Sequence, residues 1–294
     1  MAREILIEKE GHELRAAVLD DGCLVDLVIE RETNRSIVGN IYLGRVERVI
    51  EGISAAFIDI GLDKSGFLPL TKNSNNSPME VPCAEGNIVV VQAKRDGFRE
   101  KGPQLSREIS LPGRFLVYAP LGARFSVSRQ IENQTERERL LRIIGEIAEE
   151  DEGFVIRTVS EGLNLKALAV EANYLRERWK RILVKREGIA VPAVLFSELN
   201  ATHKVIRDHA QDDVVTIRFN HGGVFKEAKE YCERFSPELV ERLSYEESAV
   251  SLFDQFDIDE VIDTVLSKNA YLPSGGGLVI ESMEALTAID VNSG

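Results

Sequence analysis

Residues 39–70 constrain the fold more than any other part of the chain. They hold three short runs rich in β-branched and aromatic residues, with glycine turns between them: 41–49, 55–60 and 67–70. Runs of this kind predict strands of an antiparallel sheet. Side chains alternate along a strand, so Ile58 and Ile60 should share one face, and Phe57 and Asp59 the other. Phe57 is then an aromatic residue on a polar face.

An exposed Phe57 suits a surface on which something flat stacks, although a shifted register would make it an ordinary core residue. A basic loop with an aromatic residue, KRDGFREK at 94–101, follows the strand-like run 88–93. Short strands, glycine turns and a basic loop together predict an OB-type barrel that binds single-stranded nucleic acid.

The charge composition agrees with a nucleic-acid-binding barrel only when it is counted region by region. The net charge of −13 disfavours a nucleic-acid partner, but residues 39–115 hold ten Lys and Arg against nine Asp and Glu. Cys23, Cys83 and Cys232 form no CxxC pair, which predicts no disulfide framework, no structural zinc and a reduced, cytoplasmic setting. The chain has no apolar run long enough to span a membrane, and MAREILIEKEG has no signal core.

Further elements follow from periodicity and turn signals. Residues 3–30 predict a three-stranded meander, 71–82 a polar loop, and 188–196 a connector. Capping boxes predict helix starts at Thr135, with Glu138, and at Asp257, with Glu260. Strand 153–159 and helix 164–185 suggest a small α/β unit. Strand 214–219, helices 224–235 and 258–268, and strands 277–281 and 285–291 complete the prediction.

Three segments, in order, carry a resemblance to a family: GNIYLGRV, AAFIDIGLDKSGFLPL and LPSGGGLVIESMEALTAIDVNSG. They resemble the bacterial ribonuclease E/G family, and the compact ribonuclease G type more closely. The resemblance runs through the chain but covers only the amino-terminal part of a family catalytic region.

The resemblance implies an α+β and α/β multidomain fold. An OB-fold at 36–108 would be inserted into a ribonuclease-H-like subdomain made of residues 1–35 and 213–276. A 5′-end sensor subdomain would span 109–212, and 277–294 would begin a deoxyribonuclease-like catalytic subdomain.

The strongest catalytic candidate is Asp290, which shares a strand face with Asn292. Spacing alone favours the interpretation of this pair as the polar end of a strand that enters a turn. The resemblance implies that Asp290 is a magnesium ligand and Asn292 its partner. It also implies a second metal-binding aspartate and a zinc-binding cysteine motif beyond Gly294. We therefore expect the 294-residue chain to have an incomplete magnesium site and little activity.

The resemblance places Arg157 and Thr158 in a pocket for a 5′-monophosphate, together with Val117 and Gly113. Arg supplies a charged fork and Thr a hydroxyl donor, although Arg157 could instead form a surface ion pair. Because Arg157 and Thr158 are consecutive, the strand must end or bulge there, or Thr158 must use its backbone amide.

The resemblance also assigns an RNA-binding surface to four residues: Phe57, Phe67, Lys94 and Lys101. The expected function is a single-strand-specific, magnesium-dependent endoribonuclease of RNA processing and decay that prefers 5′-monophosphorylated RNA. It would form a homo-oligomer at full length. The alternatives are a non-catalytic OB-fold RNA-binding protein and a general OB-fold factor of translation or RNA chaperoning.

Overall fold

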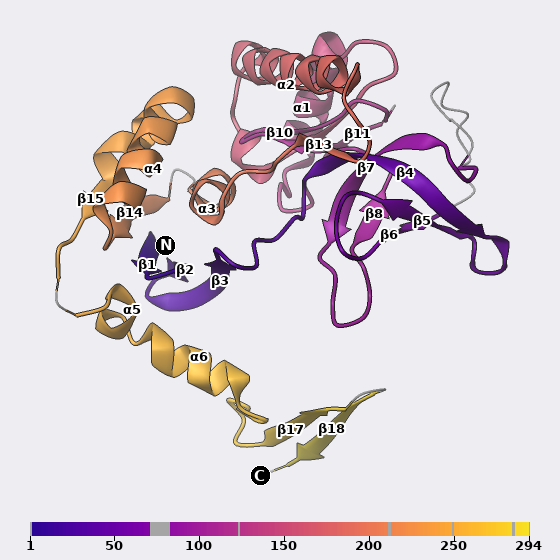
Figure 1. Cartoon of the computed structure of the whole chain (residues 1–294). Coiled ribbons are helices and arrows are strands. Elements are labelled where there is room, and N and C mark those ends of the chain that lie inside the picture. The colour runs from indigo at the N-terminus through magenta and orange to yellow at the C-terminus, as the bar shows by residue number, and fades with distance from the viewer. Residues whose placement is uncertain are drawn as a thin grey trace. The chain divides into compact units, whose positions relative to one another are not determined.

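The computed structural model describes residues 2–70, 83–122, 124–210, 213–248, 250–283 and 286–293. The chain has a mixed α+β architecture (Figure 1). It divides into two compact units, one made of residues 1–35 and 200–294 and the other of residues 36–199. The predicted polar loop at 71–82 lies outside the described residues. No helix in the described part is long and apolar enough to cross a membrane.

The first unit is built on a five-stranded sheet in the order β15-β14-β1-β2-β3. Its strands are β1 (Arg3–Glu10), β2 (Glu13–Asp20), β3 (Cys23–Arg31), β14 (Val214–Phe219) and β15 (Leu243–Tyr245). The predicted meander at 3–30 is confirmed, and its turns use positive φ at Gly11, Asp21 and Gly22. Strand β14 joins β1 in parallel, so two segments about 200 residues apart form the centre of the sheet.

Helices cover both faces of this sheet. On one face, Ile5 and Val18 pack with residues of α3 (Ala201–His209) and α4 (Gly222–Phe235). On the other face, Leu6 and Leu19 pack with Phe253 and Ile258 of α5 (Leu252–Gln255) and α6 (Ile258–Leu266). A short 3-10 helix, η3 (Pro237–Arg242), precedes β15. Burial on both faces explains why the centre of β1 is continuously apolar.

The second unit contains a closed five-stranded barrel. Its strands are β4 (Ile41–Ile50), β5 (Ala55–Asp59), β6 (Gly66–Pro69), β7 (Ile88–Arg95) and β8 (Gln104–Ser106), with the 3-10 turn η1 (Glu51–Ile53) between β4 and β5. The order β4-β5-β6-β8-β7 is closed by pairing of β4 with β7, which is consistent with an OB-fold. The interior is tight. A Cβ atom on Gly66 would lie 2.3 Å from Leu105 Cδ1, and one on Gly44 2.6 Å from Ile58 Cγ2.

The predicted connector at 188–196 is wrong in part, because Ala193–Phe196 form strand β13. This strand pairs with β4 at residues 41–43. Strand β5 pairs with β4 only from Arg45 onward, so the first residues of β4 have an open edge. Backbone groups at a sheet edge need partners, and β13 supplies them.

A small α/β subdomain completes the second unit. Its sheet has the order β11-β12-β10-β9. The strands are β9 (Leu111–Pro112), β10 (Leu116–Ala119), β11 (Phe125–Val127) and β12 (Gly153–Ile156). Helices α1 (Gln134–Ile147) and α2 (Leu165–Arg186) share a core with it, and the sole tryptophan, Trp179, is buried there.

Both predicted capping boxes are wrong. Helix α1 begins one residue before Thr135, because the Asn133 side chain caps it by accepting the backbone N–H of Glu136 at 3.2 Å. Helix α6 does follow Asp257, but Asp257 has a left-handed backbone with φ of 55° and no side-chain cap. The helices therefore form where apolar periodicity predicts them, but their starts are fixed differently.

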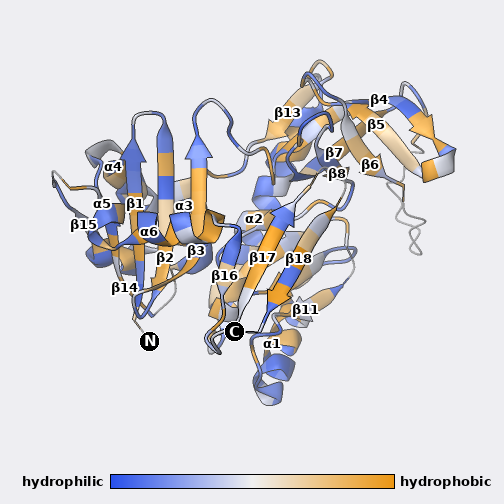
Figure 2. Ribbon diagram, turned by 90° about the horizontal axis from the view of Figure 1, so that it is seen from below, coloured by the Kyte–Doolittle hydropathy of each residue, from blue (hydrophilic) through white to orange (hydrophobic). Residues whose placement is uncertain are grey.

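The chain ends in a three-stranded antiparallel sheet of β16 (Asn269–Tyr271), β17 (Gly277–Ser282) and β18 (Thr287–Asn292). The predicted final strand pair is confirmed, except that residue 285 lies outside the described part. The register places Leu278 opposite Val291, and Ile280 opposite Ile289. Both strands carry orange, hydrophobic segments beside blue ones in Figure 2, and Ile289 and Val291 are exposed.

A buried ion pair ties the α/β subdomain together. The Arg176 side chain of α2 and the Glu152 side chain before β12 are 8% and 5% exposed. Arg176 Nε donates to Glu152 Oε2 at 3.0 Å, and Arg176 Nη2 donates to the Ile147 carbonyl at the end of α1 at 2.7 Å. One guanidinium thus joins α1, α2 and the start of β12.

We predict that Arg176→Met lowers the free energy of unfolding by about 3 kcal/mol, since removing one partner leaves the Glu152 carboxylate buried and unpaired. Urea denaturation measures the change. The control is Lys180→Met on the same helix, which breaks only an exposed pair with Glu177 and should change little. Equal effects of the two substitutions would contradict the structural role of Arg176.

Candidate functional site

Two phenylalanines lie side by side on the outer wall of the barrel. Phe57 of β5 pairs directly with Phe67 of β6, and their ring centroids are 6.0 Å apart in an edge-to-face arrangement. Their neighbours Ile58 and Leu68 point into the barrel core. The predicted separation of faces in β5 is therefore confirmed, and Phe57 and Phe67 form a partly exposed aromatic pair.

Arg48 extends this aromatic pair, and sequence reasoning missed it. Arg48 of β4 lies opposite Phe57, with its guanidinium carbon 5.6 Å from the ring centroid. Simple alternation would place Arg48 on the same face as Val46, which is buried in the core. A register shift between these two residues turns Arg48 outward. The signal for it in the sequence is an arginine at a position that alternation from Val46 would turn inward.

The basic loop lies beside the aromatic pair. Phe98 and Lys101 exchange backbone hydrogen bonds of 3.0 Å, and Phe98 is 71% exposed. The loop then runs along β6, where the Pro103 carbonyl accepts the Phe67 N–H at 2.8 Å. The fold therefore brings the exposed Lys101 segment to the strand that carries Phe67.

Lys94 has different surroundings. Its ammonium donates to Gln92 Oε1 at 2.7 Å and to Ser110 Oγ at 3.1 Å, and burial lowers its pKa. Gln92 also donates to the carbonyls of Gly39 and Ser110. Lys94 therefore takes part in a partly buried polar network of the barrel wall. Its ammonium is hydrogen-bonded within that network, unlike the exposed Lys101.

A second group of predicted residues surrounds the tight turn between β9 and β10. The Gly113 N–H donates to the Leu116 carbonyl at 2.8 Å, which closes the turn. Arg157 Nη1 donates to the Gly113 carbonyl at 2.9 Å, and the Arg157 N–H donates to the Phe115 carbonyl at 2.9 Å. The fold thus brings together Arg157 and Gly113, which are 44 residues apart in the sequence.

Arg157 stands where a strand ends. Strand β12 stops at Ile156, and a 3-10 turn, η2, covers Thr158–Ser160. Because the strand ends, Arg157 and Thr158 need not point to opposite faces of a sheet, which removes the conflict in the sequence. The Thr158 hydroxyl lies 2.8 Å from Ser128 Oγ and 2.9 Å from Gln130 Oε1.

Val117 contributes to a small apolar strip next to this turn. It pairs with Val155 on one side and with Pro112 on the other. Val117 and Pro112 are partly buried, and Val155 is exposed, whereas their strand neighbours Leu116 and Ile156 are fully buried. The four predicted pocket residues, Gly113, Val117, Arg157 and Thr158, therefore come from one end of one small sheet.

Asp290 and Asn292 lie together on β18. Asn292 Nδ2 donates to Asp290 Oδ2 at 3.3 Å, and both side chains are exposed. No group of three His, Cys, Asp or Glu side chains suited to a metal ion occurs among the described residues. Magnesium is typically held by one or two carboxylates and substrate phosphates. One carboxylate and one amide fit part of such a site and do not complete it.

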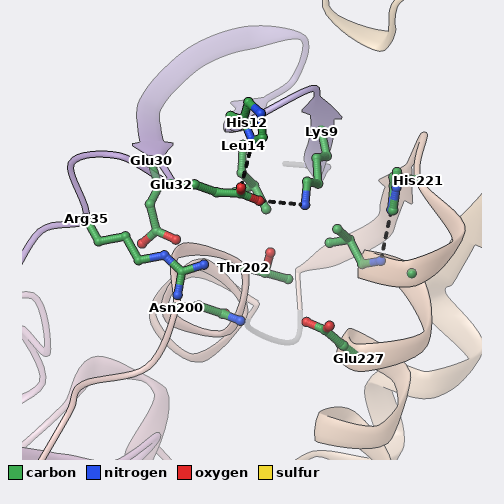
Figure 3. Close-up of a pocket in the computed structure, with 12 residues that line it drawn as sticks. Lys9, His12, Leu14, Glu30, Glu32, Arg35, Asn200, Thr202, His221 and Glu227 are labelled. Carbon is green, nitrogen blue, oxygen red and sulfur yellow. Dashed lines mark hydrogen bonds and ion pairs between the residues drawn. The ribbon is translucent and has the colours of Figure 1, made fainter.

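A polar cavity of about 170 Å³ lies in the first unit, at the starts of α3 and α4 (Figure 3). Its charged lining consists of Lys9, Arg35, Glu30, Glu32 and Glu227, with His12 and His221 beside them. Hydrogen bonds to the side chains of His12 and Lys9, together with the charge of Lys9, lower the pKa of Glu32 to about 2. Three carboxylates against two permanent cations disfavour a phosphate ligand. The barrel wall and the β9–β10 turn are therefore the better candidate sites.

Comparison with known proteins assigns the sequence that forms this barrel, α/β subdomain and sheet unit to a class of ribonucleases. Residues 110–294 match the model of the ribonuclease E/G family. Ribonuclease G of Escherichia coli (strain K12) is 35% identical over an alignment of 308 positions, which covers 100% of this chain and 63% of the relative. Ribonuclease G of Haemophilus influenzae is 34% identical, with 100% and 62% covered.

Ribonuclease E of Haemophilus influenzae is 30% identical, over 100% of this chain and 33% of the relative. The chain belongs to the ribonuclease E/G family. Within the family it is more similar to ribonuclease G than to ribonuclease E. It spans about 63% of the length of the ribonuclease G relatives.

Proposed function

We propose that this chain is the RNA-binding part of an endoribonuclease that acts on single-stranded RNA. The observation that carries the proposal is the Phe57–Phe67 pair on the outer barrel wall, with Arg48 and the Lys101 loop beside it. Ring faces stack on unpaired bases, and this stacking tolerates any sequence. Bases inside a duplex are not available for such stacking, so the surface favours single strands.

The proposal includes a preference for RNA with a 5′-monophosphate. Arg157 would donate to the phosphate oxygens, and Thr158 would add a hydroxyl. Gly113 would act through its backbone, whose carbonyl holds Arg157, and Val117 would pack against the first nucleotide. A 5′-hydroxyl offers no charge for Arg157, so it should bind this turn weakly. Family membership supports the proposal, since residues 110–294 include the whole turn.

The proposal assigns hydrolysis to Asp290 and Asn292 with magnesium. Bound magnesium would supply Lewis-acid activation of water and phosphate. Asp290 would hold the ion by charge, and Asn292 would orient that carboxylate through its 3.3 Å contact. One carboxylate supplies little charge to hold the ion before substrate binds, so we propose that residues 1–294 alone cleave RNA poorly. A zinc site, a homo-oligomer and roles in RNA processing and decay in the cytoplasm belong to the proposal for the full-length enzyme.

The subdomain layout is also part of the proposal. Residues 1–35 and 213–276 would form the ribonuclease-H-like subdomain, 36–108 the OB-fold, 109–212 the 5′ sensor, and 277–294 the start of a deoxyribonuclease-like subdomain. The second candidate function is a non-catalytic RNA-binding protein, since the aromatic pair on the barrel wall needs no catalytic group to bind RNA.

We predict that Phe57→Ala weakens binding of a short unstructured RNA about five- to 150-fold, because one stacked base contributes roughly 1–3 kcal/mol. Phe57→Tyr keeps the ring and should bind like the wild type. Lys101→Ala should reduce the slope of log affinity against log salt concentration by about 0.7. Fluorescence anisotropy measures both effects, and unchanged affinity in the Phe57→Ala, Lys101→Ala double variant would refute the proposed surface.

A second prediction concerns the 5′ end. The wild type should bind a 5′-monophosphorylated RNA at least about tenfold more tightly than its 5′-hydroxyl counterpart, as expected for a charge-assisted contact. Arg157→Ala should remove this preference, and Arg157→Lys, which keeps the charge but not the fork, should retain part of it. Titrations of both RNAs into each variant measure the ratio. A ratio of one in the wild type would exclude the pocket.

A third prediction concerns catalysis. The 294-residue chain should show little magnesium-dependent cleavage of a 5′-monophosphorylated single strand, because Asp290 alone cannot both anchor the ion and position water. Gel analysis of the purified chain measures the cleavage, with Asp290→Asn as the matched control. Strong cleavage that Asp290→Asn abolishes would show that the site is complete in this chain and would contradict the prediction.

A further inference from the structure

The turn between β9 and β10 is held by a carboxylate from another element. Three consecutive backbone N–H groups, those of Arg114, Phe115 and Leu116, donate to the two oxygens of Glu171 at 2.8, 2.8 and 2.7 Å. Glu171 lies in the second turn of α2 and is 55 to 57 residues away in the sequence. Successive N–H groups that converge in this way form an anion-binding concavity, which here is filled from within the chain.

We propose that Glu171 is a positioning residue for recognition of the RNA 5′-phosphate, an inference that rests on the proposed function. Its carboxylate fixes the turn, the turn presents the Gly113 carbonyl, and that carbonyl orients the guanidinium of Arg157. The Arg157 backbone is held by the same turn through the Phe115 carbonyl. The backbone and the guanidinium of Arg157 are therefore both hydrogen-bonded to the turn that Glu171 holds.

The chemistry of the contact requires a carboxylate. It accepts at both oxygens and donates nothing, so it satisfies three converging N–H groups at once. A glutamine there would present an amide NH₂ to at least one of them and leave a donor unsatisfied. Burial raises the pKa of Glu171, while the three N–H groups and the nearby charge of Arg157 act in the opposite direction.

Gly113 fits this contact from the other side. A Cβ atom there would lie 2.7 Å from the Glu171 carboxyl carbon and 2.9 Å from each of its oxygens. No side chain therefore fits at position 113 while the carboxylate stays in place. Gly113 and Glu171 form one steric unit, so either can be altered to disturb the other.

Ser160 completes the anchoring. Its hydroxyl donates to the Phe115 carbonyl at 2.7 Å, the same carbonyl that accepts the Arg157 N–H. The N–H groups of the turn are therefore hydrogen-bonded to Glu171 of α2, and its Phe115 carbonyl is hydrogen-bonded to Ser160 of η2. Loss of Glu171 should release the N–H side alone, which loosens Arg157 without unfolding the sheet below it.

The test compares Glu171→Gln with wild type in the 294-residue chain. We expect the ratio of affinities for 5′-monophosphorylated and 5′-hydroxyl RNA to fall at least fivefold, while affinity for the 5′-hydroxyl RNA stays within twofold. Amide hydrogen exchange at residues 114–116 should accelerate at least tenfold. Glu177→Gln on the exposed part of α2 is the control and should change neither measurement.

Gly113→Ala provides a second route if Glu171→Gln folds poorly. It should lower the same affinity ratio, and combining the two substitutions should add little. An undiminished ratio in Glu171→Gln, with faster exchange at 114–116, would overturn the inference, because the turn would then be loosened without effect on recognition. A wild-type ratio of one identifies failure of the proposed function itself, before any variant is compared, and overturns the inference with it.

Discussion

The second unit depends on one strand that belongs to two hydrophobic cores. Tyr42 and Val46 of β4 point into the barrel, whereas Ile41 and Leu43 pack in the core of the α/β subdomain. The same strand forms ladders with β5, β7 and β13. Because β4 is part of both cores, the barrel and the α/β subdomain cannot move independently without exposing apolar side chains. The aromatic pair and the β9–β10 turn are therefore held in a fixed relation.

This shared strand gives the proposed function a physical basis. Stacking on an aromatic surface binds single-stranded RNA without regard to its sequence or its end. A contact with the 5′-phosphate recognises one charged group at one end of the strand. Because both sites lie in one compact unit, both contacts can contribute to the same binding event without the entropy cost of ordering a linker. The candidate catalytic residue Asp290 belongs to the other unit, so recognition can be tested without it.

Much of this arrangement could be predicted from the sequence. Alternation in β5 placed Phe57 on the outer face, and turn glycines located the meander of the first unit. The failures have physical causes. The register shift beside Arg48 cannot be seen in an alternating pattern. Strand β13 pairs with the part of β4 that β5 leaves unpaired, a contact between segments distant in sequence. Asn133, and not Thr135, caps α1. Family resemblance supplied Arg157, but only the fold shows Glu171 beneath its turn.

The most direct test of the account is photo-crosslinking of the whole chain to a 5′-monophosphorylated single-stranded RNA. The RNA carries 4-thiouridine either next to the 5′ end or several nucleotides downstream, and mass spectrometry identifies the crosslinked peptides. The account predicts that the 5′-proximal probe crosslinks within 110–117 or 155–160. The downstream probe should crosslink within 45–69 or 96–103. Crosslinks confined to residues 1–35 and 200–294 for both probes would contradict it.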